Sequence, residues 1–421
     1  MSFGIPVRNG LGIGLRASTS LSTRSSGGTA PAISLNFLAG GPLDSRITFT
    51  RASTATFVGS NGLIQSAAID APRFDYDPTT LAAEGLLIEE QRTNLLAYSD
   101  QFNNAAWDKT NVTVTANATT SPDGTANADA VFETTTTGFH SVNSATTIVV
   151  ALSGQTYTAS FYIKANGRTK GFMSVVSGGG FVTFDITAKT ITFGGNGTNE
   201  TVIAQTITES SNGWFRLTMT SSFSGAANVK PTLGLSNDAG SSSYTGDVSK
   251  GVFLYGAQLE AGSFPTSYIP TGVIQVTRSA DVATITGTNF SSWFNATQGT
   301  FVFAGDSAYG SGGFIGSTPT TGAILYANAN ASRTSNGTNV ITTANTYANN
   351  AVFNTALGYS ASGRSLVLNG GTIATDANLI QTPTAITLGG AFGGNYLNGH
   401  ARAISFYNTR LSDATLQALT T

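Results

Sequence analysis

The sequence predicts an all-β protein whose main parts are two successive β-sandwiches. Only 10% of the residues are charged, whereas 49 are glycine, and 25 Phe and 13 Tyr recur at strand-like intervals. Residues 157–164 show the pattern clearly, because every second side chain from Tyr157 to Ile163 is apolar or aromatic. Between residues 99 and 272 no amphipathic helix longer than two turns is visible, so strands must supply the core.

The stretch from Gly251 to Asp281 divides the chain. Its first half alternates with the period of a strand that is covered on both faces. Gly262 ends this strand, and Pro265 and Pro270 stiffen the connector because neither can lie inside a central strand. An extended run, 273–277, follows at once. We expect the last strand of one domain, a rigid link and the first strand of the next.

Four segments follow from this division. Residues 1–45 form an extended N-terminal arm, whose first 28 residues contain arginine but no acidic residue. Residues 46–98 form a small β segment. Residues 99–272 contain strands at the spacing of a sandwich or jelly roll. Residues 273–421 contain similarly spaced strands and are expected to form a second sandwich.

Local signals place several smaller elements. Ser60-Asn61-Gly62 lies between two extended runs and predicts a hairpin. Glu89 and Glu90, beside Arg92, predict an ion-pairing rim and not a catalytic pair, because adjacent strand residues face opposite sides. At the C-terminus, Ser412 is a helix cap. The short helix that it begins is expected to fold onto the sheet through its leucines, Leu416 and Leu419.

Charge and composition limit the partners. The formal net charge is −2, so the protein has no overall positive electrostatic field to attract the phosphates of a nucleic acid. Nucleic acid is therefore not an expected partner. No apolar run approaches the roughly 20 residues of a membrane span, so no membrane insertion is expected. The chain has no cysteine, which excludes disulfides and thiolate metal sites.

Catalytic motifs are missing from the sequence. It contains no nucleophile elbow, no zinc-protease helix and no phosphate-binding loop. The histidines, His140 and His400, are expected in surface or turn roles. Asp247 is expected to cap a turn, with a structural calcium ion as the alternative. The remaining candidate carboxylates are scattered and cannot be paired from sequence: Asp185, Glu209, Glu260 and Asp306. The sequence therefore predicts no enzyme, no catalytic residue, no metal ligand and no cofactor.

Sugar binding needs flat aromatic surface beside neutral hydrogen-bonding groups, and the composition supplies both. The tryptophans stand beside other apolar residues and are expected in the core: Trp107, Trp214 and Trp293. Three tyrosines lie among Gly, Asn and Ser in expected loops, and we predict them as platforms for a host cell-surface glycan: Tyr309, Tyr347 and Tyr396.

Several pieces of the sequence together resemble a family of tailed-bacteriophage virion proteins. They are TRASTATFVGSNGLI, GLLIEEQRTNLLAYSDQF, SYTGDVSKGVFLYGAQLEAGSFPTSYIPT, VTRSADVATI and the closing NGHARAISFYNTRLSDATLQALT. The resemblance covers about residues 46–421. It implies a carbohydrate-binding-module-like jelly roll followed by a concanavalin A-like, laminin-G-type sandwich.

The resemblance also implies a function. The protein would be a tail fibre or spike at the virion surface, anchored to other virion proteins by its N-terminal arm and presenting lectin-like domains to host glycans. A homo-oligomer is expected, for which a trimer is one option. The alternative is a capsid decoration or head-fibre protein, and a further alternative is a polysaccharide-degrading tail spike.

Overall fold

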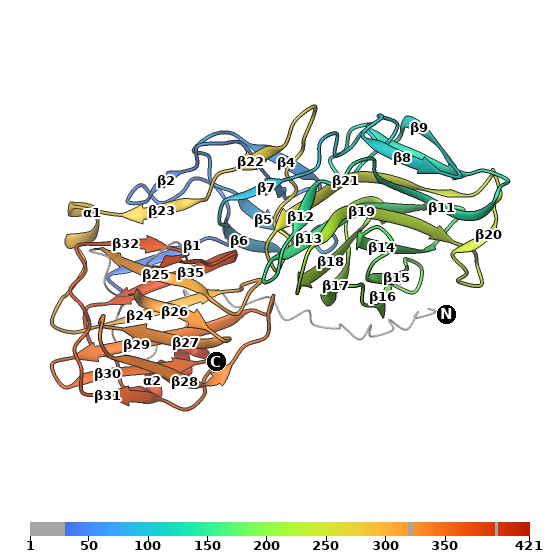
Figure 1. Ribbon diagram of the computed structural model, residues 1–421. Helices are drawn as coiled ribbons and strands as arrows, with labels where there is room; N and C mark the ends of the chain where they lie inside the picture. Colours follow the sequence, from blue (N-terminus) through green and yellow to red (C-terminus); the bar gives the residue numbers. More distant parts are fainter. Residues whose placement is uncertain (1–29, 319–322, 392–394) are drawn as a thin grey trace, which may run out of the picture.

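The computed structural model describes residues 30–318, 323–391 and 395–421, and it confirms an all-β fold. Two β-sandwiches lie side by side, and the segment that follows the N-terminal arm passes between them (Figure 1). Most of the expected arm, residues 1–29, lies outside the described residues.

The central sandwich comprises residues 107–261. Its first sheet has the strand order β17-β18-β13-β21-β10-β9. The bounds of these strands are β9 (Val112–Thr119), β10 (Ala128–Glu133), β13 (Thr156–Asn166), β17 (Glu200–Glu209), β18 (Phe215–Phe223) and β21 (Gly251–Ala261). The facing sheet has the order β16-β15-β14-β19-β11-β20, with β12 beside β19 and β8 beside β11. Its strands are β8 (Trp107–Thr110), β11 (Thr137–Ser144), β12 (Val149–Ala151), β14 (Lys170–Val176), β15 (Phe181–Asp185), β16 (Thr190–Gly195), β19 (Ala227–Ser236) and β20 (Ser243–Thr245).

Strand β13 is buried on both faces. Its Phe161 face packs into the core between the two sheets. The other face carries Tyr162, whose ring packs edge-on against Tyr268 of the link. Opposite Tyr162, β21 contains a bulge at Gly256, which has a φ of +59°. A Cβ there would come within 3.0 Å of the Tyr162 ring, so the aromatic contact requires glycine.

The C-terminal sandwich is built from two distant parts of the sequence. One sheet has the order β31-β30-β29-β24-β35-β6-β5, with β1 also paired to β35. Its strands are β1 (Ile33–Asn36), β5 (Phe74–Tyr76), β6 (Ala83–Ile88), β24 (Gly299–Gly305), β29 (Phe353–Ser360), β30 (Gly363–Leu368), β31 (Ala374–Asp376) and β35 (Gly399–Tyr407). The facing sheet has the order β2-β23-β32-β25-β26-β27-β28. Its strands are β2 (Thr48–Thr50), β23 (Val282–Ile285), β25 (Gly312–Thr318), β26 (Ala323–Asn328), β27 (Ala331–Ser335), β28 (Val340–Thr346) and β32 (Ala385–Leu388).

The strand pairings give domain boundaries that differ from those predicted from the sequence. The segment 46–98 is not a separate small unit, because β2, β5 and β6 extend the two sheets of the C-terminal sandwich. The end of the expected arm also joins it, since Ile33 and Leu35 enter the same core as Phe301 and Phe406. Pairings between the two ends of a chain leave no local signal in the sequence.

The remaining elements are short. Three two-stranded pairs accompany the sandwiches: β3 (Ala55–Val58) with β4 (Ile64–Ala67), β7 (Arg92–Asn94) with β22 (Val276–Arg278), and β33 (Gly390–Ala391) with β34 (Asn395–Tyr396). The β3–β4 hairpin confirms the turn predicted at Asn61. Besides the 3-10 turn η2 (Ser211–Gly213), the helices among the described residues are α1 (Thr288–Ser291) and α2 (Asp413–Thr420). Across the described ranges, no helix has the length and apolar character that a membrane crossing requires.

Helix α2 forms as predicted. The hydroxyl of Ser412 accepts a hydrogen bond from the backbone N–H of Thr415 at 3.2 Å. Leu416 and Leu419 are buried against the outer face of the sheet that contains β29 and β30. The helix therefore closes this side of the C-terminal sandwich.

A buried ion network joins the segment 51–89 to residues 278–281. Arg51 pairs with Asp281 at 3.0 Å, Arg73 pairs with Asp281 and, at 2.7 Å, with Glu89, and Arg278 pairs with Glu89 at 3.1 Å. No side chain in the network is more than 7% exposed. Burial alone would raise the pKa of the Glu89 carboxyl, but the charges of Arg278 and Arg73 outweigh it and hold the pKa well below its usual range.

The same network holds the link between the sandwiches. The backbone N–H and the hydroxyl of Ser267 both donate to Glu89, each at 2.7 Å. Next to it, the amide group of Asn94 donates to the carbonyl of Ile269 at 2.9 Å, and the side-chain oxygen of Gln258 accepts from the N–H of Ile269 at 2.6 Å. Side-chain hydrogen bonds, in addition to the two prolines, therefore fix the link.

Replacing one carboxylate of the network should destabilise the whole protein. Glu89→Gln leaves the buried guanidinium groups of Arg73 and Arg278 short of a counter-charge, and we expect a loss of about 3–5 kcal/mol in the free energy of unfolding. Chemical denaturation measures this loss. Glu209→Gln makes the same chemical change in an exposed pair with Lys189 and should cost less than about 1 kcal/mol. Equal effects of the two variants would contradict the account.

The cost of Glu89→Gln should also depend on pH. The pKa of Glu89 is lower in the folded protein than in the unfolded chain. The ionised carboxylate therefore stabilises the fold fully above the ordinary glutamate pKa of about 4.3, and this stabilisation is lost as the pH falls through the folded-state pKa. The stability difference between wild type and variant is therefore full at neutral pH and narrows in strong acid. A difference that stays constant from about pH 7 to about pH 3 would refute the assigned pKa shift.

Candidate functional site

A cleft of about 600 Å³ lies where the two sandwiches, the link and the β3–β4 hairpin meet. One wall is the outer face of β17 and β18 in the central sandwich. The opposite wall comes from three loops or strand ends of the C-terminal sandwich, at Asp306, Asn349 and His400. Residues 263–268 of the link border it as well. The volume is within the range of ligand-binding pockets in proteins, about 300–1,000 Å³.

The wall on the central sandwich is a row of threonine hydroxyls. Thr206 and Thr208 of β17 are exposed, and the hydroxyl of Thr206 bonds to that of Thr218 at 2.6 Å. Thr220 continues the row on β18. Alternate strand residues share a face, so a run of threonines at every second position produces a hydroxyl-covered surface.

Arg216 and Tyr162 add a cation and an aromatic ring to the same wall. The guanidinium group lies 5.5 Å from the centre of the Tyr162 ring and donates to the Ser160 hydroxyl at 3.0 Å. Its Nε is buried and has no hydrogen-bond partner among the described residues. The wall therefore combines a positive charge and an aromatic ring with the threonine hydroxyls.

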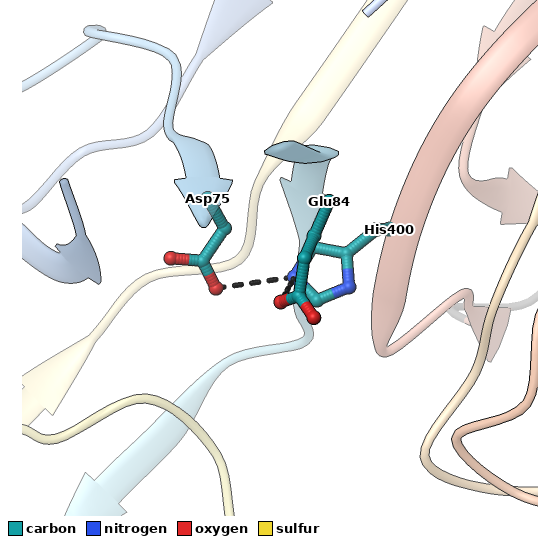
Figure 2. A group of neighbouring side chains, drawn as sticks. All are labelled: Asp75, Glu84 and His400. Carbon is teal, nitrogen blue, oxygen red and sulfur yellow. Dashed lines mark hydrogen bonds and ion pairs between the residues drawn. The ribbon is translucent and has the colours of Figure 1, made fainter. Parts of the chain in front are cut away.

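The opposite wall contains a histidine surrounded by carboxylates. Nδ1 of His400 lies 2.8 Å from Asp306, and Nε2 lies 3.1 Å from Asp75 and 3.6 Å from Glu84. Figure 2 shows the Asp75 and Glu84 side chains converging on the ring from the neighbouring strands. Arg402 lies 3.8 Å from the second oxygen of Asp306. We call Asp75, Glu84, Asp306 and His400 the His400 cluster.

The strand order explains why these residues meet. His400 lies on β35, whose neighbours are β24, which ends next to Asp306, and β6, which carries Glu84. Strand β5 lies beyond β6 and brings Asp75. Glu84 sits in an irregularity of the β5–β6 pairing, followed by Gly85 with a φ of +122°. A Cβ on Gly85 would come within 2.4 Å of the Ala401 carbonyl, so this close approach requires glycine.

Electrostatics of the cluster favour a positive charge at its centre. Burial would lower the pKa of His400, but the charges and hydrogen bonds of Asp306 and Asp75 raise it well above 6.5. Burial raises the pKa of Glu84, and the neighbouring Asp75 and Asp306 raise it further while His400 opposes them. The cluster can therefore hold a proton or another cation between its carboxylates.

The structure does not bring the three predicted tyrosine platforms together. Tyr347 is 6% exposed and stacks on Phe353 inside the core, so its prediction as a platform is wrong. Tyr396 is half-buried against the same core. Tyr309 is 45% exposed and stacks on Phe264, a residue that borders the cleft. Neighbouring Gly and Asn residues indicate a loop, but they do not show whether a tyrosine in that loop is exposed or packs into the core.

Other sequence expectations have mixed outcomes. The expected core tryptophans are buried: Trp107, Trp214 and Trp293. His140 is not a surface residue but is buried in β11, where its ring nitrogens contact the backbone oxygens of Asn111 and Tyr244. Asp247 accepts hydrogen bonds from the N–H and hydroxyl of Ser249, as a turn cap does. Of the expected rim, Glu90 pairs with Arg92 at 2.6 Å, whereas Glu89 is buried.

Sequence reasoning missed the His400 cluster. Asp75 and His400 are 325 positions apart, and none of the four residues belongs to a local motif. The only signal was the concentration of acidic residues between positions 75 and 84.

Comparisons with known proteins give distant similarities in fold alone. No family model matches the sequence, and no curated protein matches it. Among solved structures, a Trypanosoma rangeli sialidase matches with 11% identity and a TM-score of 0.28, over 57% of this chain and 47% of the sialidase. Domains LG4-5 of the mouse laminin α1 chain match with 11% identity and a TM-score of 0.20, over 65% of this chain and 84% of theirs.

A Bacteroides ovatus protein described as a candidate carbohydrate-binding protein matches with 11% identity and a TM-score of 0.26, over 67% of this chain and 78% of its own. The chain spans about half the length of the sialidase that it matches. None of these structures indicates a phage origin.

The sialidase matches correct one prediction. The sequence predicted that the protein is not an enzyme, on the ground that catalytic motifs are missing. Solved structures that match this chain include enzymes. The prediction that the protein is not an enzyme is therefore wrong. Similarity at this TM-score and identity assigns no activity to this chain.

Proposed function

We propose that the protein binds carbohydrate in the cleft between its two sandwiches. The observation that carries the proposal is the lining, in which the Thr206–Thr218 hydroxyl row lies across the cleft from Asn349 and Asn350, with Tyr162 and Phe264 beside them. Sugars present hydroxyl groups that need neutral donors and acceptors, and apolar ring faces that stack on aromatic side chains. Tyr309, stacked on Phe264, extends this surface at the edge of the cleft.

Arg216 gives the proposed site a charged hydrogen-bond donor, because it lines the cleft. Its Nε is buried, so the other N–H groups of the guanidinium are the ones that can donate to a ligand oxygen. The hydroxyl groups of Thr206 and Thr208 lie on the neighbouring strand. We expect Arg216 and these threonines to contact the same ligand.

For the biological setting, we propose the surface of a tailed-phage virion. The support is the sequence resemblance over residues 46–421. In this setting the N-terminal arm binds other virion proteins, several copies of the chain act together, and the cleft engages a host surface glycan. A capsid decoration protein and a polysaccharide-degrading tail spike are the alternatives. Deleting residues 2–29, which leaves β1 in the C-terminal sandwich, should remove the protein from purified virions; normal occupancy without these residues would contradict the anchoring role.

Binding should be lost when the cleft wall is changed. We expect the purified full chain to bind one or more oligosaccharides on a glycan array. Arg216→Met combined with Thr208→Val removes a donor and a hydroxyl from one wall and should weaken binding at least tenfold, since each lost hydrogen bond costs about 0.5–3 kcal/mol. Titration calorimetry with the selected oligosaccharide measures the change.

Thr192→Val is the matched control. Thr192 is an exposed strand residue on β16, outside the cleft lining, and loses the same hydroxyl group. Its affinity should equal that of wild type. The proposal fails if the wild-type chain binds nothing on a broad array, or if the double variant binds as tightly as the Thr192→Val control.

A further inference from the structure

We propose that Asp75, Glu84 and His400 form a binding site for a first-row divalent transition ion, of which Zn²⁺ is the probe. One ligand atom from each residue lies within 4.8 Å of the other two. Imidazole nitrogen and carboxylate oxygen are both common zinc ligands. This inference does not depend on the proposed function, because an ion can bind there whether or not the cleft binds sugar.

The distances fit a bound ion with little rearrangement. In a tetrahedral site with bonds of about 2.1 Å, ligand atoms are about 3.4 Å apart. Nε2 of His400 lies 3.1 Å from the Asp75 oxygen and 3.6 Å from the Glu84 oxygen. These separations bracket the expected value, and all three groups come from paired strands of one sheet, which fixes their positions.

Asp306 supplies the support that such a histidine needs. Its Oδ1 lies 2.8 Å from Nδ1 of His400, the ring nitrogen that faces away from Asp75 and Glu84. A ligating histidine usually donates its other N–H to a carboxylate, and this contact turns the Nε2 lone pair toward the metal. The backbone N–H of His400 also donates to Asp306 at 3.2 Å, so the carboxylate is held in place.

The donor set also indicates which ion fits. Calcium takes six to eight oxygen ligands, whereas this site offers one nitrogen and two carboxylates. Asp75 and His400 border the cleft, so an ion held by them would be within reach of water or of a ligand hydroxyl there. The inference departs from the sequence-based expectation of no metal ligand and from the alternative that placed calcium at Asp247.

Titration calorimetry tests the site. Chelator-treated full chain is titrated with ZnCl₂ and, separately, with CaCl₂. We expect one Zn²⁺ per chain, bound more tightly than Ca²⁺. His400→Gln should abolish binding, and Glu84→Gln should weaken it at least tenfold. Glu84 is 34% exposed at its side chain, so its substitution leaves the fold intact, which circular dichroism checks. Asp306→Asn should weaken binding about 10- to 100-fold without changing the stoichiometry.

Glu209→Gln is the matched control, because it removes the same charge from the cleft without touching the ligands. It should bind Zn²⁺ as wild type does. The proposal is overturned if wild type binds no stoichiometric Zn²⁺, if Ca²⁺ binds more tightly than Zn²⁺, or if Glu84→Gln and Glu209→Gln have equal affinities.

Discussion

The buried network of three arginines and two carboxylates is the constraint on which the rest of the structure depends. It takes Arg51 and Arg73 from the N-terminal segment, Glu89 from the end of β6, and Arg278 and Asp281 from the start of the C-terminal sandwich. Charges buried this deeply are tolerated only when they are paired and hydrogen-bonded. The segment 51–89 and residues 278–281 must therefore be paired for this region of the structure to close.

The cleft follows from that closure. Glu89 also accepts two hydrogen bonds from Ser267, so the link is held against the C-terminal sandwich. Arg73 precedes β5 and Glu89 follows β6, and these strands carry Asp75 and Glu84 to His400. The ion-network residues, which hold the link between the sandwiches in place, are thus close in sequence to residues that line the cleft. A ligand that contacts both walls meets surfaces whose separation is already fixed, which reduces the entropy cost of binding.

Sequence reasoning succeeded where the signal is local. The strand β21, the hairpin at Asn61 and the capped helix after Ser412 each depend on residues within a few positions of one another. It failed where contacts are distant, as in the pairing of Ile33 with Phe406 and the meeting of Asp75 with His400. Of the predicted platforms, Tyr347 turns inward because its ring completes the core around Phe353. The motif pieces that support the resemblance contain four of the five network residues, all but Arg73. The buried pairing of these residues left no signal in the sequence.

Hydrogen–deuterium exchange of the full chain tests the central claim that the ligand lies between the sandwiches. Exchange is measured with and without the oligosaccharide selected on the array. A ligand in the cleft should protect backbone amides on both walls: in 204–220 of the central sandwich, in 349–350 and 398–400 of the C-terminal sandwich, and in the link at 263–268. Protection confined to one sandwich, away from the link, would contradict it.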